Sequence, residues 1–370
     1  MPGMKNAVML VLLCCTLLAK GQDPPGKTEL WRANEEGIFA HFVYGLVVTT
    51  QGTILAFAEA RIKDGKDDGA HHIVMKRSTD GGNTFSASRV LVNSMHGQSW
   101  ANPTIVQDKK TGELFLFYAL NQKNDSSQVF YMTSTDDGLT WQDAKEVTHL
   151  FAGSQQGWTF HLPGPGHGIQ LKNKRLIVPV WHRKSVSFAA ADRKYGVNCI
   201  YSDDHGKTWK SGGDAPVGEF NESQIVEKAN GDILLLGRTH SPENGSFQAK
   251  VISRNRGASW SAPIEYDEGL AGAVCDIGLT RYSLKPNIIL VSQPADPKKR
   301  RDLTIRLSRN EGATWPVSKL LQQGSATYSD LAVLPDGTIV CLYGHGGSRH
   351  MPDVVSLARF SLKWILRNGE

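Results

Sequence analysis

The sequence predicts an all-β fold, a six-bladed β-propeller, from one short motif that occurs five times and from the spacing of its copies. The motif is Ser-x-Asp-x-Gly-x-Thr-Trp, with Phe for Trp in the first copy and Asn for Asp in the last two. The copies span Ser78–Phe85, Ser134–Trp141, Ser202–Trp209, Ser253–Trp260 and Ser308–Trp315. Their starts are 56, 68, 51 and 55 residues apart, which is typical of propeller blades built from several short strands.

Each copy of this Asp-box motif predicts one hairpin turn. An Asp or Asn side chain accepts hydrogen bonds from nearby backbone N–H groups and fixes a tight turn. The Gly two residues later adopts a positive φ at little cost. The Thr or Ser and the closing aromatic residue then begin a strand and bury a large apolar side chain.

The remaining chain supports a single domain over residues 22–370. At about 55 residues per blade, this length fits six blades closed into one ring. No low-complexity linker and no useful helix-period segment interrupts the pattern. Short apolar runs bounded by Gly and Asp turns predict strands at 44–49, 54–58, 114–119, 175–181, 232–236, 287–292 and 338–343.

The N-terminus has the form of a secretory signal peptide, which we place at residues 1–21. Lys5 precedes an apolar run from Ala7 to Ala19, and small residues follow at a suitable cleavage site. We therefore expect a secreted or periplasmic protein. No other run is long and apolar enough to cross a bilayer.

Composition excludes some functions and favours none by itself. A net charge of +5 without a clustered basic face argues against nucleic-acid binding. The three cysteines after the leader, Cys199, Cys275 and Cys341, are odd in number, so we expect buried thiols and no disulfide framework. No metal-ligand spacing or phosphate-binding Gly loop is present, and we predict no cofactor.

Beyond the Asp boxes, four segments carry a resemblance to a known family. They are Gly164–Leu171, Arg175–Pro179, Asn221–Glu227 and Ala326–Leu331. With the boxes, they make nearly the whole mature chain resemble the sialidase (exo-neuraminidase) family. This resemblance implies six blades, an active site at one mouth of the central axis, and retaining hydrolysis of a terminal acidic sugar on a glycan or glycoconjugate.

The resemblance implies three catalytic residues. Asp67, with Asp68 as the neighbouring alternative, matches the general acid/base. Tyr328 matches the nucleophile, and Glu222 matches the glutamate that takes its proton. A phenol suits a sugar whose anomeric carbon carries a carboxylate, because an anionic nucleophile would be repelled, and a phenol with a pKa of about 10 needs a base.

Sialidases bind the substrate carboxylate with three arginines, because a guanidinium binds carboxylate bidentately. Arg238 matches the second arginine, and Arg300 or Arg301 matches the third. The first is missing: the family's Arg-Ile-Pro motif is replaced by residues 42–44, Phe-Val-Tyr. The glutamate that holds this arginine is also missing, because Gly344 stands at its position.

Loss of both partners predicts a rebuilt subsite. Phe42 and Tyr44 are two apart on a strand, so we expect them on the same side, as an aromatic platform for the sugar. Arg61 and His161 are candidate substitute ligands for the substrate. This change makes the identity of the sugar substrate less certain than the hydrolytic mechanism.

The leading interpretation is an exported exo-glycosidase of the sialidase type. One alternative is a related propeller that cleaves a uronic or ketodeoxy acid by hydrolysis or β-elimination, with Tyr328 or His161 as the base. Another is a glycan-binding propeller without turnover. The combination of a Tyr–Glu pair with an Asp argues against the last, because binding alone does not need it.

Overall fold

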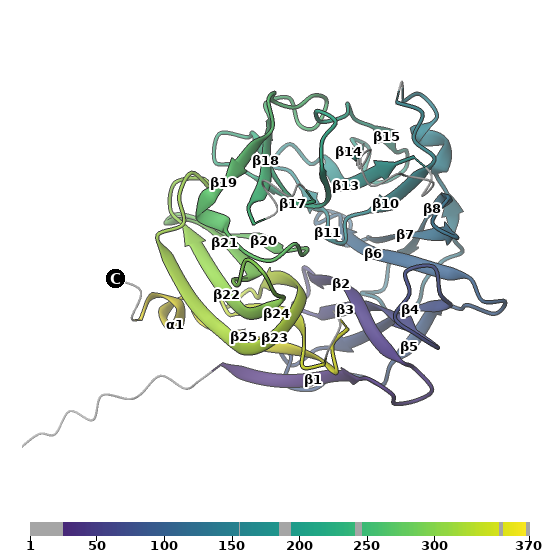
Figure 1. The fold of residues 1–370 in the computed structure, drawn as a ribbon, viewed down its shortest axis with the longest axis horizontal. Coiled ribbons are helices and arrows are strands. Elements are labelled where there is room, and N and C mark those ends of the chain that lie inside the picture. The colour runs from purple at the N-terminus through teal and green to yellow at the C-terminus, as the bar shows by residue number, and fades with distance from the viewer. Residues whose placement is uncertain (1–24, 155, 185–193, 241–245, 348–350, 368–370) are drawn as a thin grey trace, which may run out of the picture.

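The structure is a computed structural model that describes residues 25–154, 156–184, 194–240, 246–347 and 351–367. The predicted signal peptide at 1–21 lies outside the described residues. The regular secondary structure of the described part is nearly all strand, arranged around a central axis (Figure 1). None of its helices is long and apolar enough to span a bilayer.

The strands fall into antiparallel groups that follow one another along the chain. The first two groups are β2 (Ala40–Val48), β3 (Ile54–Arg61), β4 (His71–Ser78), β5 (Arg89–Val92), and β6 (Ser99–Gln107), β7 (Leu114–Gln122), β8 (Ser126–Ser134), β9 (Lys145–Glu146). The third is β10 (Phe160–Pro163), β12 (Ile169–Gln170), β13 (Leu176–Arg183), β14 (Gly196–Ser202), β15 (Lys210–Ser211), and the fourth is β16 (Phe220–Glu227), β17 (Ile233–Thr239), β18 (Gln248–Ser253), β19 (Glu265–Asp267).

The last two groups share one long strand. β20 (Gly278–Leu284), β21 (Asn287–Pro294) and β22 (Arg301–Ser308) pair with the first part of β23 (Val317–Val333). The second part of β23 pairs with β24 (Ile339–His345), which pairs with β25 (Val354–Phe360). The predicted all-β propeller is confirmed, and this grouping is consistent with six blades.

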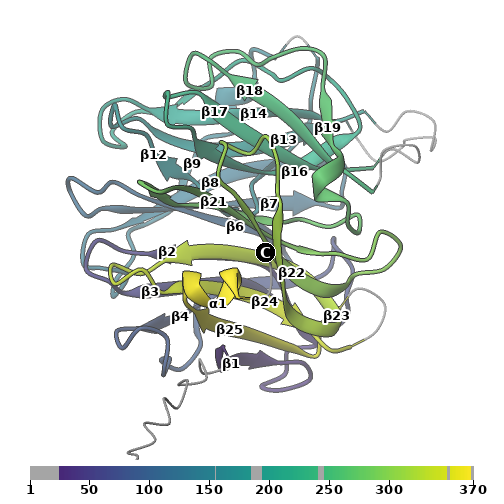
Figure 2. The same ribbon diagram turned by 90° about the vertical axis from the view of Figure 1, so that its left-hand side faces the viewer.

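The ring is closed by pairing the first described strand with the last. β1 (Gly26–Arg32) runs antiparallel to β25, with Gly26 opposite Arg359 and Arg32 opposite Val354. Figure 2 shows β1 beside β25 at one edge of the molecule. The sixth group therefore takes strands from both ends of the described chain. The remaining elements are β11 (Gly166–His167), the 3-10 helices η1 (Thr148–Phe151) and η3 (Glu268–Leu270), and α1 (Leu362–Leu366).

The Asp boxes form the turns that the sequence predicts. In the first, Asp80 Oδ1 accepts from Thr84 N at 3.0 Å, and Ser78 Oγ accepts from Gly82 N at 2.9 Å. Gly206 in the third copy shows why the motif needs glycine. Its φ is +83°, and a Cβ there would lie 2.0 Å from the Phe115 ring.

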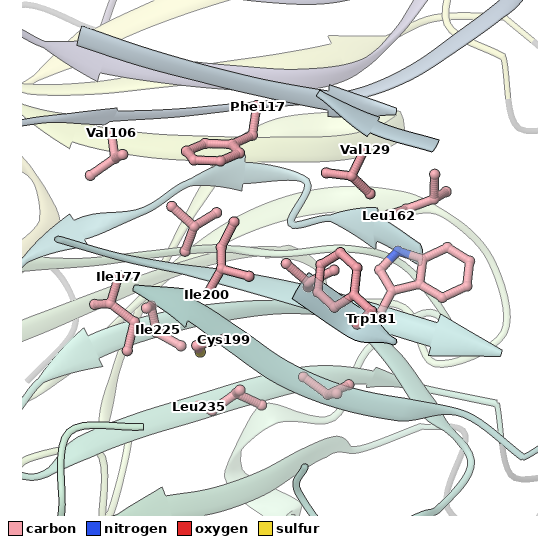
Figure 3. Packing of buried hydrophobic residues seen from close by; sticks show 14 of the residues in the cluster. Val106, Phe117, Val129, Leu162, Ile177, Trp181, Cys199, Ile200, Ile225 and Leu235 are labelled. Atoms are coloured by element: carbon pink, nitrogen blue, oxygen red, sulfur yellow. The ribbon is translucent and has the colours of Figure 1, made fainter. Parts of the chain in front are cut away.

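Apolar side chains between neighbouring sheets form the core. Figure 3 shows part of the largest cluster, where Phe117 and Val106 of the second group face Ile177, Ile200 and Trp181 of the third. Cys199 is buried in this cluster, and Cys275 and Cys341 are also buried and unpaired. Packing across sheet interfaces fixes each blade, and with it the innermost strands that carry the candidate site.

Candidate active site

The candidate site is a polar pocket of about 220 Å³ at one mouth of the central axis. Its walls come from the innermost strands β2, β6, β10, β16 and β23 and from the ends of β3, β13 and β17. Tyr328, Glu222, Arg238, Asp67, Phe42 and Arg61, all singled out from the sequence, line it. The volume suits one sugar unit better than an extended chain.

Tyr328, Glu222 and Arg238 form a tight hydrogen-bonded cluster. The Tyr328 hydroxyl donates to the Glu222 carboxylate, with both oxygens at 2.6 Å. Arg238 Nη1 lies 2.6 Å from Glu222 Oε2 and 2.6 Å from Tyr328 Oη. These residues are distant in sequence, on β23, β16 and β17, and come together because all three strand ends reach the same mouth.

This cluster places a phenol between a base and a cation. Burial raises the pKa of Tyr328 well above its ordinary value, although the charges of Arg238 and Arg300 act in the opposite direction. The guanidinium carbon of Arg300 lies 5.2 Å from the Tyr328 ring centroid. Arg301 instead pairs with Asp302, so Arg300 is the arginine that reaches the site. A phenol in this setting ionises only if Glu222 takes the proton.

Asp67 lies at the rim, on the loop between β3 and β4. Its side chain is 77% exposed, and Oδ1 pairs with Arg61 Nη1 at 2.9 Å. Its backbone carbonyl accepts from Ser99 Oγ and Asn121 Nδ2, both at 2.8 Å. Asp67 is therefore held over the pocket, while Asp68 is exposed and does not line it.

Arg61 lines the pocket, but its guanidinium is already bonded to protein groups. It is fully buried, and its Nε and Nη2 donate to Glu59 Oε2 at 3.1 and 2.9 Å. Its Nη1 bonds Asp67 and the Gly65 carbonyl. Since each of its nitrogens already has a protein partner, Arg61 fixes two carboxylates instead of offering a free donor.

Glu59 is a site residue that the sequence reasoning missed. Burial raises its pKa from 4.5 to about 7, although the Arg61 charge and the hydrogen bond from Asn102 N favour the carboxylate. Its position two residues before Arg61 on β3 places both side chains on one face. That spacing was available from the sequence.

The aromatic platform predicted for Phe42 and Tyr44 is wrong for Tyr44. Val43 has a φ of +54° and lies in a β-bulge, so Phe42 pairs with Glu59 and Tyr44 with Ala58. The extra residue turns Tyr44 away from the pocket. Phe42 lines the pocket, with its ring centroid 4.6 Å from that of Tyr328 and 5.1 Å from the Arg61 guanidinium carbon.

Tyr44 fills the space beside Gly344. A Cβ on Gly344 would lie 2.3 Å from Tyr44 Oη and 2.4 Å from Thr327 Oγ1. A glutamate at position 344 therefore has no room while Tyr44 is present. The two sequence departures, at 42–44 and at 344, meet in space.

His161 does not belong to the site. Its Nδ1 lies 2.8 Å from His182 Nδ1, its ring stacks on Phe151, and it is buried between them. Burial and the neighbouring His182 lower its pKa to about 3. The strand neighbours Phe160 and Leu162 line the pocket instead. Its proposed roles as a substrate ligand and as an alternative base are therefore wrong.

Several polar lining residues were not predicted. They include Asn221, bonded to His240 Nε2 at 3.0 Å, and Arg183 at the end of β13. Nothing in the local sequence marks Arg183, since its place at the mouth depends on the blade geometry. Among the described residues, no group of three or more His, Cys, Asp or Glu is arranged to hold a metal ion.

A larger cavity of about 600 Å³ opens at the opposite ends of the same inner strands, near Val48, Glu227 and Val333. His167 lines it and bonds Asp330 Oδ1 through Nδ1 at 2.8 Å. This cavity contains neither the Tyr–Glu pair nor Arg238. We therefore assign the chemistry to the smaller pocket.

Comparison with known proteins identifies the family and supports the fold. The BNR repeat-like domain profile matches residues 52–341. The chain belongs to the BNR-repeat sialidase family. It is 28% identical to a sialidase of Micromonospora viridifaciens over 94% of its own length, and 26% identical to human sialidase-4 over 93%. The chain spans 94% of human sialidase-4, but only 56% of the Micromonospora protein and 61% of a Bacteroides fragilis sialidase.

Solved sialidase structures have the same fold. The Hadza microbial sialidase Hz136 aligns with a TM-score of 0.78 and 25% identity over 90% of this chain and 68% of that one. The intramolecular trans-sialidase of Ruminococcus gnavus aligns with a TM-score of 0.75 and 18% identity over 90% of this chain and 97% of that one. The second likeness supports the propeller fold alone.

Proposed function

We propose that this sialidase-family protein is a retaining exo-glycosidase that releases a terminal acidic sugar from a glycan or glycoconjugate. The observation that carries the proposal is the Tyr328–Glu222–Arg238 cluster, with every link at 2.6 Å, inside a pocket for one sugar. Such a cluster activates a phenol as a nucleophile and has no evident use in binding alone.

The first half-reaction uses residues from both sides of the pocket. Tyr328 attacks the anomeric carbon while Glu222 accepts the phenol proton, and Asp67 gives a proton to the leaving glycosidic oxygen. Arg238 stabilises charge on the phenol oxygen, and Arg238 with Arg300 holds the substrate carboxylate. The products are an enzyme intermediate in which the anomeric carbon is bonded to the Tyr328 oxygen, an aryl glycoside, and the shortened glycan.

In the second half-reaction, water replaces Tyr328 at the anomeric carbon. Asp67 takes the water proton, and Glu222 returns a proton to the phenol. Two inversions give net retention of configuration. No step requires a cofactor.

The carboxylate subsite is altered, because Phe42 occupies the place of the first arginine. A hydrogen bond to a charged group contributes roughly 1.5–3 kcal/mol, so its loss weakens carboxylate binding by about one to two powers of ten. We therefore propose weak activity on ordinary sialosides and better activity on another acidic sugar. This feature keeps the second candidate open, a propeller that cleaves a uronic or ketodeoxy acid.

One experiment tests these proposals together. The protein is incubated with fluorogenic sialosides, ketodeoxy glycosides and uronosides, and the first-formed product is followed by NMR. A saturated free sugar with retained configuration supports the proposal. An unsaturated product indicates β-elimination. If the protein binds a ligand without forming product, and a thermal melt shows that it is folded, the result indicates a glycan-binding propeller.

Export is a separate proposal that rests on residues 1–21. Expression of the full chain in a secreting host, with N-terminal sequencing of the product, tests it. A mature N-terminus near residue 22 outside the cytoplasm is expected. Retention of Met1 in a cytoplasmic product would contradict it.

A further inference from the structure

Arg183 lines the candidate pocket but has no role in the mechanism above. We propose that Arg183 binds a second negatively charged group of the substrate, separate from the carboxylate held by Arg238 and Arg300. The preferred substrate is then a dianionic acidic sugar. This inference rests on the proposed function, because it concerns the same pocket.

Arg175, immediately before β13, is a useful comparison for Arg183 at the end of the same strand. Arg175 stacks on Tyr201 at 3.8 Å and donates from Nη1 to a backbone carbonyl at 2.8 Å. Arg183 stacks on Phe160 at 3.7 Å and also donates from Nη1 to a backbone carbonyl, that of Asn124, at 2.8 Å. The two side chains are held in the same way.

They differ at the remaining edge of the guanidinium. Arg175 Nε and Nη2 bind the two oxygens of Asp203, each at 2.7 Å. Arg183 forms no ion pair with any carboxylate in the described residues, and the same two nitrogens have no protein acceptor there. The Nε and Nη2 edge of a guanidinium can donate two parallel hydrogen bonds to a carboxylate or a sulfate. An anion bound in the pocket would therefore form at Arg183 the bidentate ion pair that Asp203 forms at Arg175.

Charge balance in the pocket favours the same conclusion. The lining contains the cations Arg61, Arg183 and Arg238. Arg61 is bonded to Glu59 and Asp67, and Arg238 to Glu222, so each has an anionic partner. Within the described residues, Arg183 is the lining arginine for which no carboxylate partner is found.

Burial adds to the cost of leaving this cation unpaired. Burial lowers the pKa of Arg183 below its ordinary value, although the charges of Tyr195, Asp125 and Asp67 act in the opposite direction. A partly desolvated cation gains more from a bound anion than an exposed one does. The anion can be a carboxylate or a sulfate, since both present two oxygens to the fork.

The test compares matched ligands that differ in one group. They are a nonulosonic acid glycoside whose side chain is shortened to a primary alcohol, the same sugar oxidised there to a carboxylate, and the alcohol sulfated at that carbon. Turnover is measured with 4-methylumbelliferyl glycosides, and binding with the corresponding 2,3-didehydro sugars. Only the charge at the side-chain end changes between them.

The parent should favour an anionic ligand over the alcohol by about ten- to a hundred-fold in kcat/KM, mostly through KM. The carboxylate and sulfate arms then identify which anion fits. Arg183→Met retains the apolar stem over Phe160 and should remove the preference, so that the kcat/KM values for the anions and for the alcohol become similar. Arg183→Lys should retain part of it, and Arg175→Met, the matched control, should retain all of it.

The outcomes separate this inference from the proposed function. Equal turnover of alcohol and anions by the parent, or an unchanged preference in Arg183→Met, overturns the role of Arg183 and leaves the glycosidase proposal standing. If no ligand is cleaved or bound by folded parent protein, the proposed function fails and the inference fails with it.

Discussion

The pocket has two walls that differ in how closely they follow the sialidase pattern. The nucleophile wall consists of Glu222, Arg238 and Tyr328, and each matches the family residue expected there. The rebuilt wall, as we call the side on β2, β3 and β24, has Phe42 where the family resemblance implies an arginine and Gly344 where it implies a glutamate. Tyr328 and Gly344 lie on the paired strands β23 and β24 of one blade, so residues beside the proposed nucleophile can change while the nucleophile itself is kept.

The rebuilt wall is not a simple loss. The bulge at Val43 sends Tyr44 towards Gly344, and Phe42 packs against Tyr328. Phe42 and Tyr44 occupy the space of the arginine–glutamate pair that the family resemblance implies. Because both members of that pair are absent, neither leaves the other as an unpaired buried charge. Such an exchange is tolerated, whereas removal of one partner alone is costly.

The largest expected effect is on the nucleophile wall. Tyr328→Phe should lower kcat by about a thousand-fold or more, while the Kd of a 2,3-didehydro inhibitor changes little, because only the covalent step needs the oxygen. The measurement is kcat on the best substrate from the panel, beside inhibitor titration. Near-normal turnover would remove Tyr328 from the mechanism.

The next effect concerns Glu59 on the rebuilt wall. Its folded pKa of about 7 exceeds the ordinary 4.5, so the folded state holds a proton that the unfolded state releases first. The resulting stabilisation is present below about pH 4.5 and is lost as the pH rises to 7, by about 3 kcal/mol. Urea unfolding at pH 4.5, 6 and 8 measures this slope.

Glu59→Gln should flatten that dependence, because Gln resembles the protonated form throughout. The control is Glu265→Gln, whose carboxylate is 60% exposed and should leave the slope as in the parent. An unchanged slope in Glu59→Gln would assign the effect to other groups.

A smaller change is expected from restoring the family pattern. Phe42→Arg with Gly344→Glu alone should fail, because the glutamate has no space. Adding Tyr44→Ala and Thr327→Ala removes the two nearest contacts of the new side chain and should raise kcat/KM on a fluorogenic sialoside by about ten- to a hundred-fold over Phe42→Arg alone. A combined variant no better than Phe42→Arg would show that position 344 does not support position 42.

The steric part of this argument can be tested alone. Gly344→Ala should destabilise the protein by about 1–3 kcal/mol through contact with Tyr44 Oη. Tyr44→Phe should reduce that cost, giving a non-zero coupling in a double-mutant cycle of unfolding free energies. Additive costs would mean that the two residues do not compete for space.

For chelator and reductant we expect no effect on the melting temperature, because the Asp boxes are satisfied by their own backbone and the three described cysteines are unpaired. A fall of many degrees would reveal a metal or disulfide that supports one of the walls.

Repeats and matched motifs predicted most of the fold and the nucleophile wall. The Asp boxes placed the turns because their hydrogen bonds are local, and each predicted strand overlaps an observed one, as at β7 and β24. Tyr44 and His161 were placed wrongly because a bulge and a buried stack are decided by tertiary packing. Arg183 could not be found, since its place at the mouth depends on its stacking on Phe160 and on the loop at Asn124, both distant in sequence.

Closure of the ring by β1 and β25 has a consequence for how the chain folds. Residues 26–32 are synthesised before every other described strand, yet their partner strand is the last described strand to appear. Until then, the edge of the growing assembly presents unpaired backbone groups that other chains can bind. The two paired strands are separated by most of the sequence. Bringing them together has a large loop-closure entropy cost, so we expect folding to be slow. β1 therefore closes the ring only after β25 has been made. Aggregation can compete with folding during the time before these two strands pair.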